Sequence, residues 1–294
     1  MKKIFIAILC CTSMSAFSQN IVMLDTSVVM SKGLQPAIQI NIPQISQKTL
    51  KHDWLKHIGK LSKEKASETE SENLLTEVSN PNISPTSFKV YSTLIETTSG
   101  TKLTVWITSD DITFYSKGTN VDQHMAIQKY LYDFSFSEYQ MVVMDELKTE
   151  TNRSVELEKE LTGLIKDHER SLKIISEDEG SIQKANDDIL VNNSDMKNLS
   201  AKILLQKNLV DKTASDENAN KGARKTLKDL ENEKENIEAL KETNNKHIIS
   251  WNKEIREKER NITDLIEKQS LKETEINLQK GKVQIVQSKL DSLK

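Results

Sequence analysis

Residues 227–293 read LKDLENEKENIEALKETNNKHIISWNKEIREKERNITDLIEKQSLKETEINLQKGKVQIVQSKLDSL, and they predict the architecture of the second half of the chain. One heptad frame runs through it without a break. Its a positions are Leu227, Lys234, Lys241, Ile248, Ile255, Ile262, Gln269, Ile276, Val283 and Leu290, and its d positions are Leu230, Ile237, Asn244, Trp251, Lys258, Leu265, Lys272, Gln279, Val286 and Leu293. Thirteen of these twenty positions are apolar, although Lys, Glu, Asn and Gln dominate the region. Such a repeat is typical of a coiled coil, which supplies contact surface rather than chemistry.

An earlier stretch has a heptad frame of its own. Its a positions are Leu161, His168, Ile175, Ile182, Ile189, Met196, Ile203 and Val210, and all but His168 are apolar. The two frames lose phase within residues 213–222 (TASDENANKG), which contain no large apolar residue and several residues that favour turns and helix caps. We therefore predict two long helices, residues 145–294 in all, with a turn near 214–222.

An antiparallel hairpin requires the a positions of one helix to lie level with the d positions of the other. A turn near residues 216–217 pairs Ile203 with Leu230, Met196 with Ile237, Ala185 with Ile248, Ile182 with Trp251, and Leu157 with Ile276. The predicted seam comprises Ile175, Ile182, Ala185, Ile189, Met196, Ile203, Leu230, Ile237, Ile248, Trp251, Ile255, Ile262, Leu265, Ile276, Val283, Val286 and Leu290. The competing arrangement is two parallel stalks from separate chains. Further apolar positions along the stalk leave a homo-oligomer open.

The composition changes near Met144. All four prolines lie before it, whereas the 150 residues after it contain a single aromatic residue, Trp251. This change predicts a head domain at residues 19–144, followed by the helical hairpin at 145–294.

Within the head, the residue pattern predicts a small β-α-β-β-α sheet domain of the α+β class. Alternating isoleucines at 38–42 indicate a strand, and Ser46 is a helix cap before apolar residues at helical spacing. Two β-rich runs, 88–96 and 101–109, flank a predicted hairpin turn at 97–100. Residues 112–115 are a candidate for a further short strand, and 62–71 for a loop. A second helix is expected to start at Asn120, with Asn120 as its cap.

Five aromatic residues lie on more than one face of that second helix: Tyr130, Tyr132, Phe134, Phe136 and Tyr139. Aromatic residues at this spacing usually belong to the core. The alternatives are an exposed docking patch for a partner, or a division in which one face meets the sheet and the other meets the returning C-terminal helix.

The first 18 residues have the order of a secretory signal peptide. Lys2 and Lys3 precede an apolar run, and a small-x-small site lies before Gln19. The apolar run is shorter than a membrane span needs, and the bulky residues before Cys10 argue against a lipid anchor there. We therefore expect an exported protein of the periplasm or cell envelope, or a secreted one, with no integral membrane segment in the mature chain.

Export and charge limit the chemistry. Both cysteines, Cys10 and Cys11, lie in the signal, so the mature chain has no thiolate and no disulfide. Loss of Lys2 and Lys3 changes the formal net charge from −3 to −5, which argues against a nucleic-acid partner. The chain contains no HExxH, P-loop, GxGxxG or GxSxG motif. We therefore expect no catalytic residue, no metal site and no cofactor.

One carboxylate pair leaves an alternative open. Asp110 and Asp111 follow a predicted strand, where two acids are more often a helix cap or solvated surface than a catalytic or calcium site.

The organisation resembles uncharacterised exported proteins of Gram-negative bacteria that combine a signal peptide ending in Ser-Gln, a small α/β head and a long C-terminal coiled coil. That resemblance implies no activity. The stalk alone is similar to the helical hairpins of Skp-type periplasmic chaperones, which are shorter and basic, and to those of membrane-fusion adaptors, which interrupt β-domains. We therefore expect a non-enzymatic coiled-coil scaffold or adaptor that contacts a protein partner through its head or hairpin tip. The alternative is a Skp-like holdase chaperone.

Overall fold

The computed structural model describes residues 21–69 and 72–293 of the chain. The expected signal peptide, residues 1–18, lies outside this part. The chain divides into two compact units. The first contains the described residues up to Asn152 together with those from Gly281 on, and the second is Arg153–Lys280.

The first unit is built on a six-stranded antiparallel sheet. In chain order its strands are β1 (Val22–Met30), β2 (Gly33–Pro43), β3 (Ser67–Glu68), β4 (Asn73–Val78), β5 (Phe88–Thr97) and β6 (Gly100–Thr108), and in the sheet they lie in the order β1-β2-β6-β5-β4-β3. Helix α1 (Gln47–Gly59) follows β2, and helix α2 (Val121–Lys212) follows β6. The prediction of a sheet with accompanying helices is therefore confirmed, but the sheet is larger than expected.

Three strands were not predicted from the sequence. β1 and β4 were not foreseen, and β3 lies within the stretch that was expected to be a loop. The candidate strand at 112–115 is wrong, since it contributes only a single bridge between Thr108 and Phe114. The predicted order β-α-β-β-α thus corresponds to β2, α1, β5, β6 and α2.

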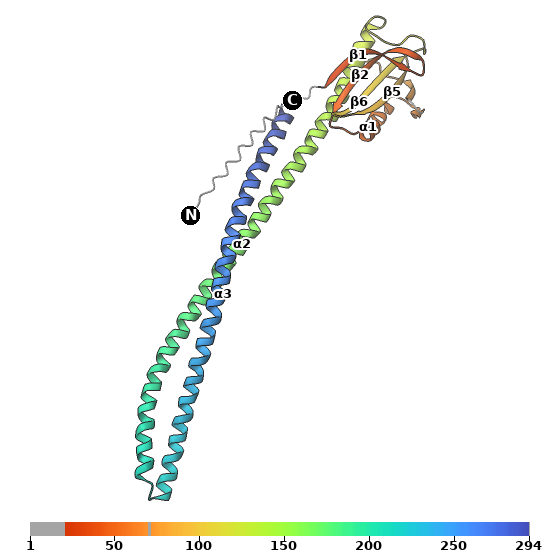
Figure 1. Ribbon diagram of the computed structural model, residues 1–294. Coiled ribbons are helices and arrows are strands. Elements are labelled where there is room, and N and C mark those ends of the chain that lie inside the picture. Colours follow the sequence, from red (N-terminus) through yellow and green to blue (C-terminus); the bar gives the residue numbers. More distant parts are fainter. Residues whose placement is uncertain (1–20, 70–71, 294) are drawn as a thin grey trace. The chain divides into compact units, whose positions relative to one another are not determined.

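One face of the sheet carries the main core. Ile38, Ile40 and Ile42 of β2 alternate toward this face, where they pack with α1 and α2 (Figure 1). Ser46 caps α1 as expected, because its side chain accepts a hydrogen bond from the Thr49 N–H at 3.2 Å. The indole of Trp54 on α1 is 1% exposed and donates to Ser92 Oγ at 3.0 Å, so its polar N–H is satisfied within the core.

The β5–β6 turn is tight, as predicted. Thr97 pairs with Gly100, which leaves only two residues between the strands. Gly100 has a φ of 154°, and a Cβ there would lie 2.2 Å from the carbonyl oxygen of Ile42 on β2. Glycine is required at this position because the neighbouring backbone occupies the space of a side chain.

Helix α2 starts where the sequence indicates, but its cap differs. Asn120 immediately precedes the first helical residue, yet its Oδ1 is buried and finds no hydrogen-bond partner among the residues that the structure describes. The main chain closes the first turn instead, with the His124 N–H donating to the Asn120 carbonyl at 2.8 Å. The expected side-chain cap at Asn120 is therefore wrong.

The two long helices meet at a short turn. α2 ends at Lys212, and α3 (Glu217–Asp291) begins after four intervening residues, within the predicted turn region. Asp216 caps α3 by accepting from the Ala219 N–H at 3.1 Å, and the Asn220 side chain donates to the Val210 carbonyl at 2.8 Å. Among the described helices, none has an apolar stretch long enough to cross a membrane.

Within the second unit, α2 and α3 lie side by side and antiparallel (Figure 1). Gln269 donates from its side chain to the Leu164 carbonyl at 3.0 Å. These two residues lie one heptad away from the predicted Leu157–Ile276 pair on both helices. Lys272 pairs with Glu160 at 2.8 Å nearby, and Lys207 pairs with Glu231 at 3.4 Å closer to the turn.

In the first unit, the last turns of α3 pack against the sheet domain. Val286 is 5% exposed and belongs to the main core, with Leu290 and Leu293 packed beside it. Lys289 pairs with Glu146 at 3.0 Å and donates to Gln44 at 2.6 Å. The C-terminal end of α3 is therefore part of the same folded unit as the sheet.

Candidate functional site

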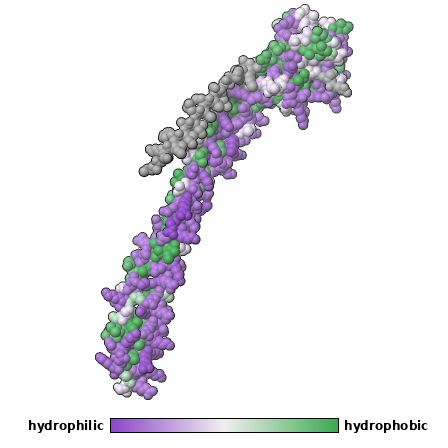
Figure 2. Space-filling view, in the orientation of Figure 1, coloured by the Kyte–Doolittle hydropathy of each residue, from purple (hydrophilic) through white to green (hydrophobic). Residues whose placement is uncertain are grey.

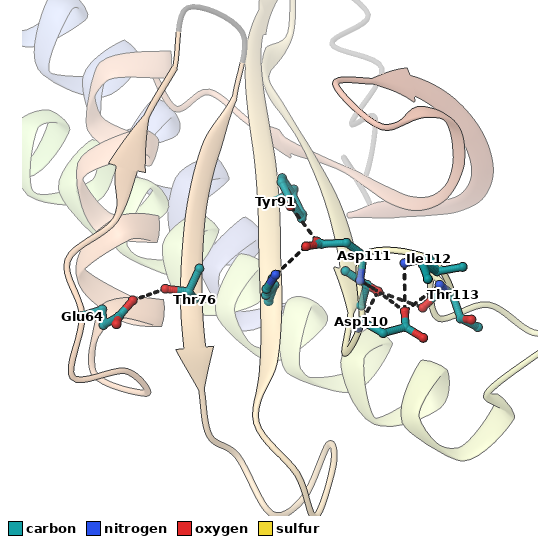
Figure 3. A network of polar contacts seen from close by, with 9 residues as sticks. Glu64, Thr76, Tyr91, Asp110, Asp111, Ile112 and Thr113 are labelled. Atoms are coloured by element: carbon teal, nitrogen blue, oxygen red, sulfur yellow. Dashed lines mark hydrogen bonds and ion pairs between the residues drawn. The ribbon is translucent and has the colours of Figure 1, made fainter.

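The loop after β6 contains the carboxylate pair that the sequence singled out (Figure 3). Asp110 Oδ1 accepts from the backbone N–H groups of Ile112 at 2.9 Å and Thr113 at 2.7 Å. These two hydrogen bonds are the main cause that lowers the pKa of Asp110. The Asp110 carboxylate therefore holds the loop in its turn conformation.

Asp111 turns the other way, toward the sheet. Its carboxylate pairs with the Lys89 ammonium and accepts from the Tyr91 hydroxyl at 2.8 Å (Figure 3). The hydrogen bond from Lys89, followed by that from Tyr91, lowers the pKa of Asp111. Burial, with the adjacent Asp111 charge, raises the pKa of Tyr91 to about 12. Asp111 also has a φ of 65°, which its short polar side chain tolerates.

The two carboxylates do not converge on a common point. Asp110 is engaged by backbone groups of its own loop and Asp111 by side chains of β5, and the pKa of each is lowered, whereas a general acid at neutral pH needs a raised pKa. This arrangement can anchor the β6–α2 loop to β5. It supports the interpretation of Asp110 and Asp111 as structural residues.

A second polar cluster ties β1 to the start of α2. His124 is 3% exposed, and its Nε2 lies 2.9 Å from Asp25 Oδ1. Lys117 and the Gln128 side chain also contact the Asp25 carboxylate. Asp25 is thus held by three side chains from the region around the α2 N-terminus. In residues 21–69 and 72–293, no three His, Cys, Asp or Glu side chains are grouped so as to hold a metal ion.

One titratable residue was missed by the sequence reasoning. Glu138 on α2 is 7% exposed, and burial, followed by the nearby Asp53 charge, raises its pKa to about 7. Its neighbours along the chain include the buried Phe134 and Tyr139. The sequence did contain a signal for this raised pKa: a glutamate lies among aromatic residues on one helix face, and burial of such a face removes water from the carboxylate.

The aromatic residues of α2 divide between inside and outside. Phe134 packs on Trp54 with ring centroids 5.2 Å apart, and Tyr139 carries the Lys289 ammonium 5.4 Å above its ring. Tyr132 is 46% exposed and stacks on Phe136 at 6.0 Å. One face therefore meets α1 and the sheet and another meets α3, which matches the divided arrangement among the three alternatives, while Tyr132 remains on the surface.

The predicted seam residues are all buried or half-buried on the two long helices. Buried and half-buried positions recur along both helices at alternating intervals of three and four residues. The buried members are Ala185, Ile203, Ile276 and Val286. The half-buried members are Ile175, Ile182, Ile189, Met196, Leu230, Ile237, Ile248, Trp251, Ile255, Ile262, Leu265, Val283 and Leu290. Polar residues share the interface, among them Gln279, which is 5% exposed.

Apolar side-chain packing is the main interaction between α2 and α3. Ion pairs between the helices flank it, such as Lys280 with Glu158 at 2.8 Å, where both side chains are about half exposed. Exposed pairs of this kind stabilise by only about 0.2–1 kcal/mol each, so apolar burial dominates the pairing.

Comparison with known proteins adds no relative: no family model, no curated protein and no solved structure matches the chain.

Proposed function

We propose that the chain is a non-enzymatic scaffold or adaptor of the cell envelope, in which α2 and α3 form an antiparallel coiled coil. The observation that carries this proposal is the three-and-four spacing of buried positions along both helices, on helices of 92 and 75 residues. That spacing is the one by which coiled-coil side chains interlock. The outward positions are mainly charged or polar, as a helix pair in water requires.

The proposed working surfaces are the sheet domain and the turn between the long helices. The sheet domain offers the exposed Tyr132, stacked on the half-buried Phe136, and aromatic side chains are frequent anchors in protein interfaces. The turn offers Asp216 and its neighbours, which the Asn220 and Asp216 hydrogen bonds hold in one conformation. A fixed turn loses little freedom when it binds.

Export is part of this proposal and rests on the order of residues 1–18. Mass spectrometry of the protein from its source cell is expected to show Gln19 as the first residue. An intact Met1 on the recovered protein would contradict export.

Crosslinking in the periplasm followed by identification of the captured proteins tests the scaffold function. A scaffold is expected to yield one folded partner whose capture is lost when Tyr132 and Phe136 are replaced by Ser, or when residues 213–216 are replaced by a Gly-Ser turn. An Asp133→Asn variant is the matched control, because Asp133 is exposed between the two aromatic residues on α2. Capture of many unfolded proteins, unaffected by these changes, would contradict the proposal.

A holdase chaperone is the second candidate, and one observation favours it. Several large apolar side chains on the long helices are exposed, among them Leu205 at 71% and Ile249 at 68%. Exposed apolar surface of this kind can hold unfolded chains. A holdase is expected to suppress the aggregation of an unfolded outer-membrane protein at stoichiometric amounts, whereas a scaffold is not.

A further inference from the structure

The outer face of α2 near the turn carries a largely apolar strip with a single charged residue. We name it the outer stripe, and it consists of Leu190, Val191, Ser194, Lys197, Asn198, Ala201, Leu204, Leu205 and Asn208. All nine residues are exposed, with Leu190 at 67%, Leu204 at 63% and Leu205 at 71%. At 100° per residue, the stripe lies opposite the helix face that contains Met196 and Ile203, which meets α3. Apolar side chains also gather over this end of α2 in Figure 2.

The stripe differs from its surroundings in charge. Lys197 is the single charged member, whereas the equivalent outward face of α3 at the same level has five charged residues among nine. Those nine are Lys225, Lys228, Asp229, Asn232, Glu235, Asn236, Ala239, Glu242 and Thr243. All nine residues of each set are exposed to solvent, so a difference in solvent exposure does not account for the difference in charge. When the outward face of one helix has few charged residues and that of its partner helix has many, the weakly charged face is typical of an interface.

The stripe is symmetric about its own centre. Two apolar doublets, Leu190–Val191 and Leu204–Leu205, lie fourteen residues apart on either side of Lys197 and Asn198. A second copy of the stripe running in the opposite direction places each doublet against the other. The small residues Ser194 and Ala201 then face each other across the contact, where they allow two helices to approach closely.

Charge also selects the antiparallel direction. Asp187 lies seven residues before Ser194, in the row of residues that runs through the middle of the contact, and in that register it faces Asn208 of the second copy. A parallel arrangement would place Asp187 against Asp187 of the second copy, which repels.

We propose that two copies of this chain associate through the outer stripe of α2, antiparallel, with the two-fold axis between Lys197 and Asn198. The contact is isologous, and each copy contributes the same residues. Four helices, α2 and α3 from each copy, then surround three seams: one within each hairpin and one between the copies. A dimer of this kind offers two sheet domains and so two equivalent sites to any partner.

Cysteine pairing in a thiol-free background tests the register. The background is the full chain with Cys10→Ser and Cys11→Ser, and Ser194→Cys and Ala201→Cys are made separately in it. The mixture of the two variants is expected to form a disulfide-linked dimer, and neither variant alone is expected to do so. Each variant carries a single cysteine, so no internal disulfide can form.

Sedimentation measures the association itself. Leu205→Glu is expected to weaken dimerisation on the order of 100-fold, because it places a charge against the Leu190 of the second copy. Asn236→Glu is the matched control, since it adds the same charge to the outward face of α3 at the level of Lys197 and is expected to leave the dimer intact. Circular dichroism checks that both variants keep their helices.

Three results would overturn the proposal. Disulfide dimers of Ser194→Cys with itself would show parallel packing. A chain that is monomeric at every concentration, with its helices intact, would show that no second copy covers the stripe. A monomer that protects an unfolded outer-membrane protein, and loses this protection in Leu205→Glu, would assign the stripe to unfolded clients instead.

Discussion

Glu138 makes the stability of the sheet domain depend on pH. Its pKa is about 7 in the folded chain, against an ordinary value of 4.5. Between these two values the folded chain keeps a proton on Glu138 that the unfolded chain has released. The free energy of unfolding therefore decreases as pH rises through this interval and levels off above it. The full shift corresponds to at most about 3 kcal/mol.

The perturbation is Glu138→Gln, which keeps the size of the side chain and removes its charge. We expect the variant to match the unchanged chain near pH 5 and to exceed it near pH 8 by at most about 3 kcal/mol. His57 on α1, whose pKa is lowered by burial and by the Lys60 charge, titrates in the opposite sense. Comparing the two chains at each pH isolates Glu138, because His57 is present in both.

Urea unfolding followed by tryptophan fluorescence measures the effect. Trp251→Phe is introduced into both chains, so the signal comes from Trp54 and Trp106, which are both buried in the sheet domain. Asp145→Asn, an exposed change on the same helix, is the control and is expected to leave the pH dependence unaltered. The same pH dependence with and without Glu138 would refute the reasoning.

Three further predictions concern the hairpin, the β6–α2 loop and the β5–β6 turn. Ala185→Cys with Ile248→Cys, in the thiol-free background, is expected to form an internal disulfide that makes a monomer run faster on a non-reducing gel, whereas covalent dimers without an internal bond would indicate parallel stalks. Asp111→Ala removes the partner of Lys89 and Tyr91 and is expected to lower the free energy of unfolding by about 1–3 kcal/mol, with Asp133→Asn as the surface control; an unchanged urea midpoint would contradict this. Gly100→Ala is expected to lower it by more than about 1 kcal/mol, because the added Cβ meets the Ile42 carbonyl, whereas Gly163→Ala, which adds a Cβ in open space, is expected to leave it unchanged or raise it.

The sequence predicted those elements whose pattern is local. Heptads reveal a helix pair because apolar residues every three or four positions can be buried on one side only by a helix. The alternating isoleucines of β2, the paired runs of β5 and β6, and the Ser46 cap each occupy a few consecutive residues. Such signals do not depend on what lies elsewhere in the chain.

β1 and β4 had no such signal. β1 reads VMLDTSVVM, in which apolar residues occur side by side, because it is an edge strand with most of its residues partly exposed. β4 contains an irregular register between Leu75 and Val78 that interrupts its alternation. Both strands exist because β2 and β5 offer them hydrogen-bonding edges, and a partner edge is not encoded in the strand itself.

The two long helices that follow a mixed head and meet at a turn can thus be predicted from the sequence, since helix periodicity and turn formers are properties of neighbouring residues. The packing of Val286 and Lys289 in the sheet domain, the opposite directions of Asp110 and Asp111, and the burial of Glu138 are visible only in the folded chain. Each of these depends on residues far away in the chain, among them Glu146, Lys89 and Asp53. Burial and charge environment are set by what packs around a side chain, and one-dimensional spacing does not contain that information.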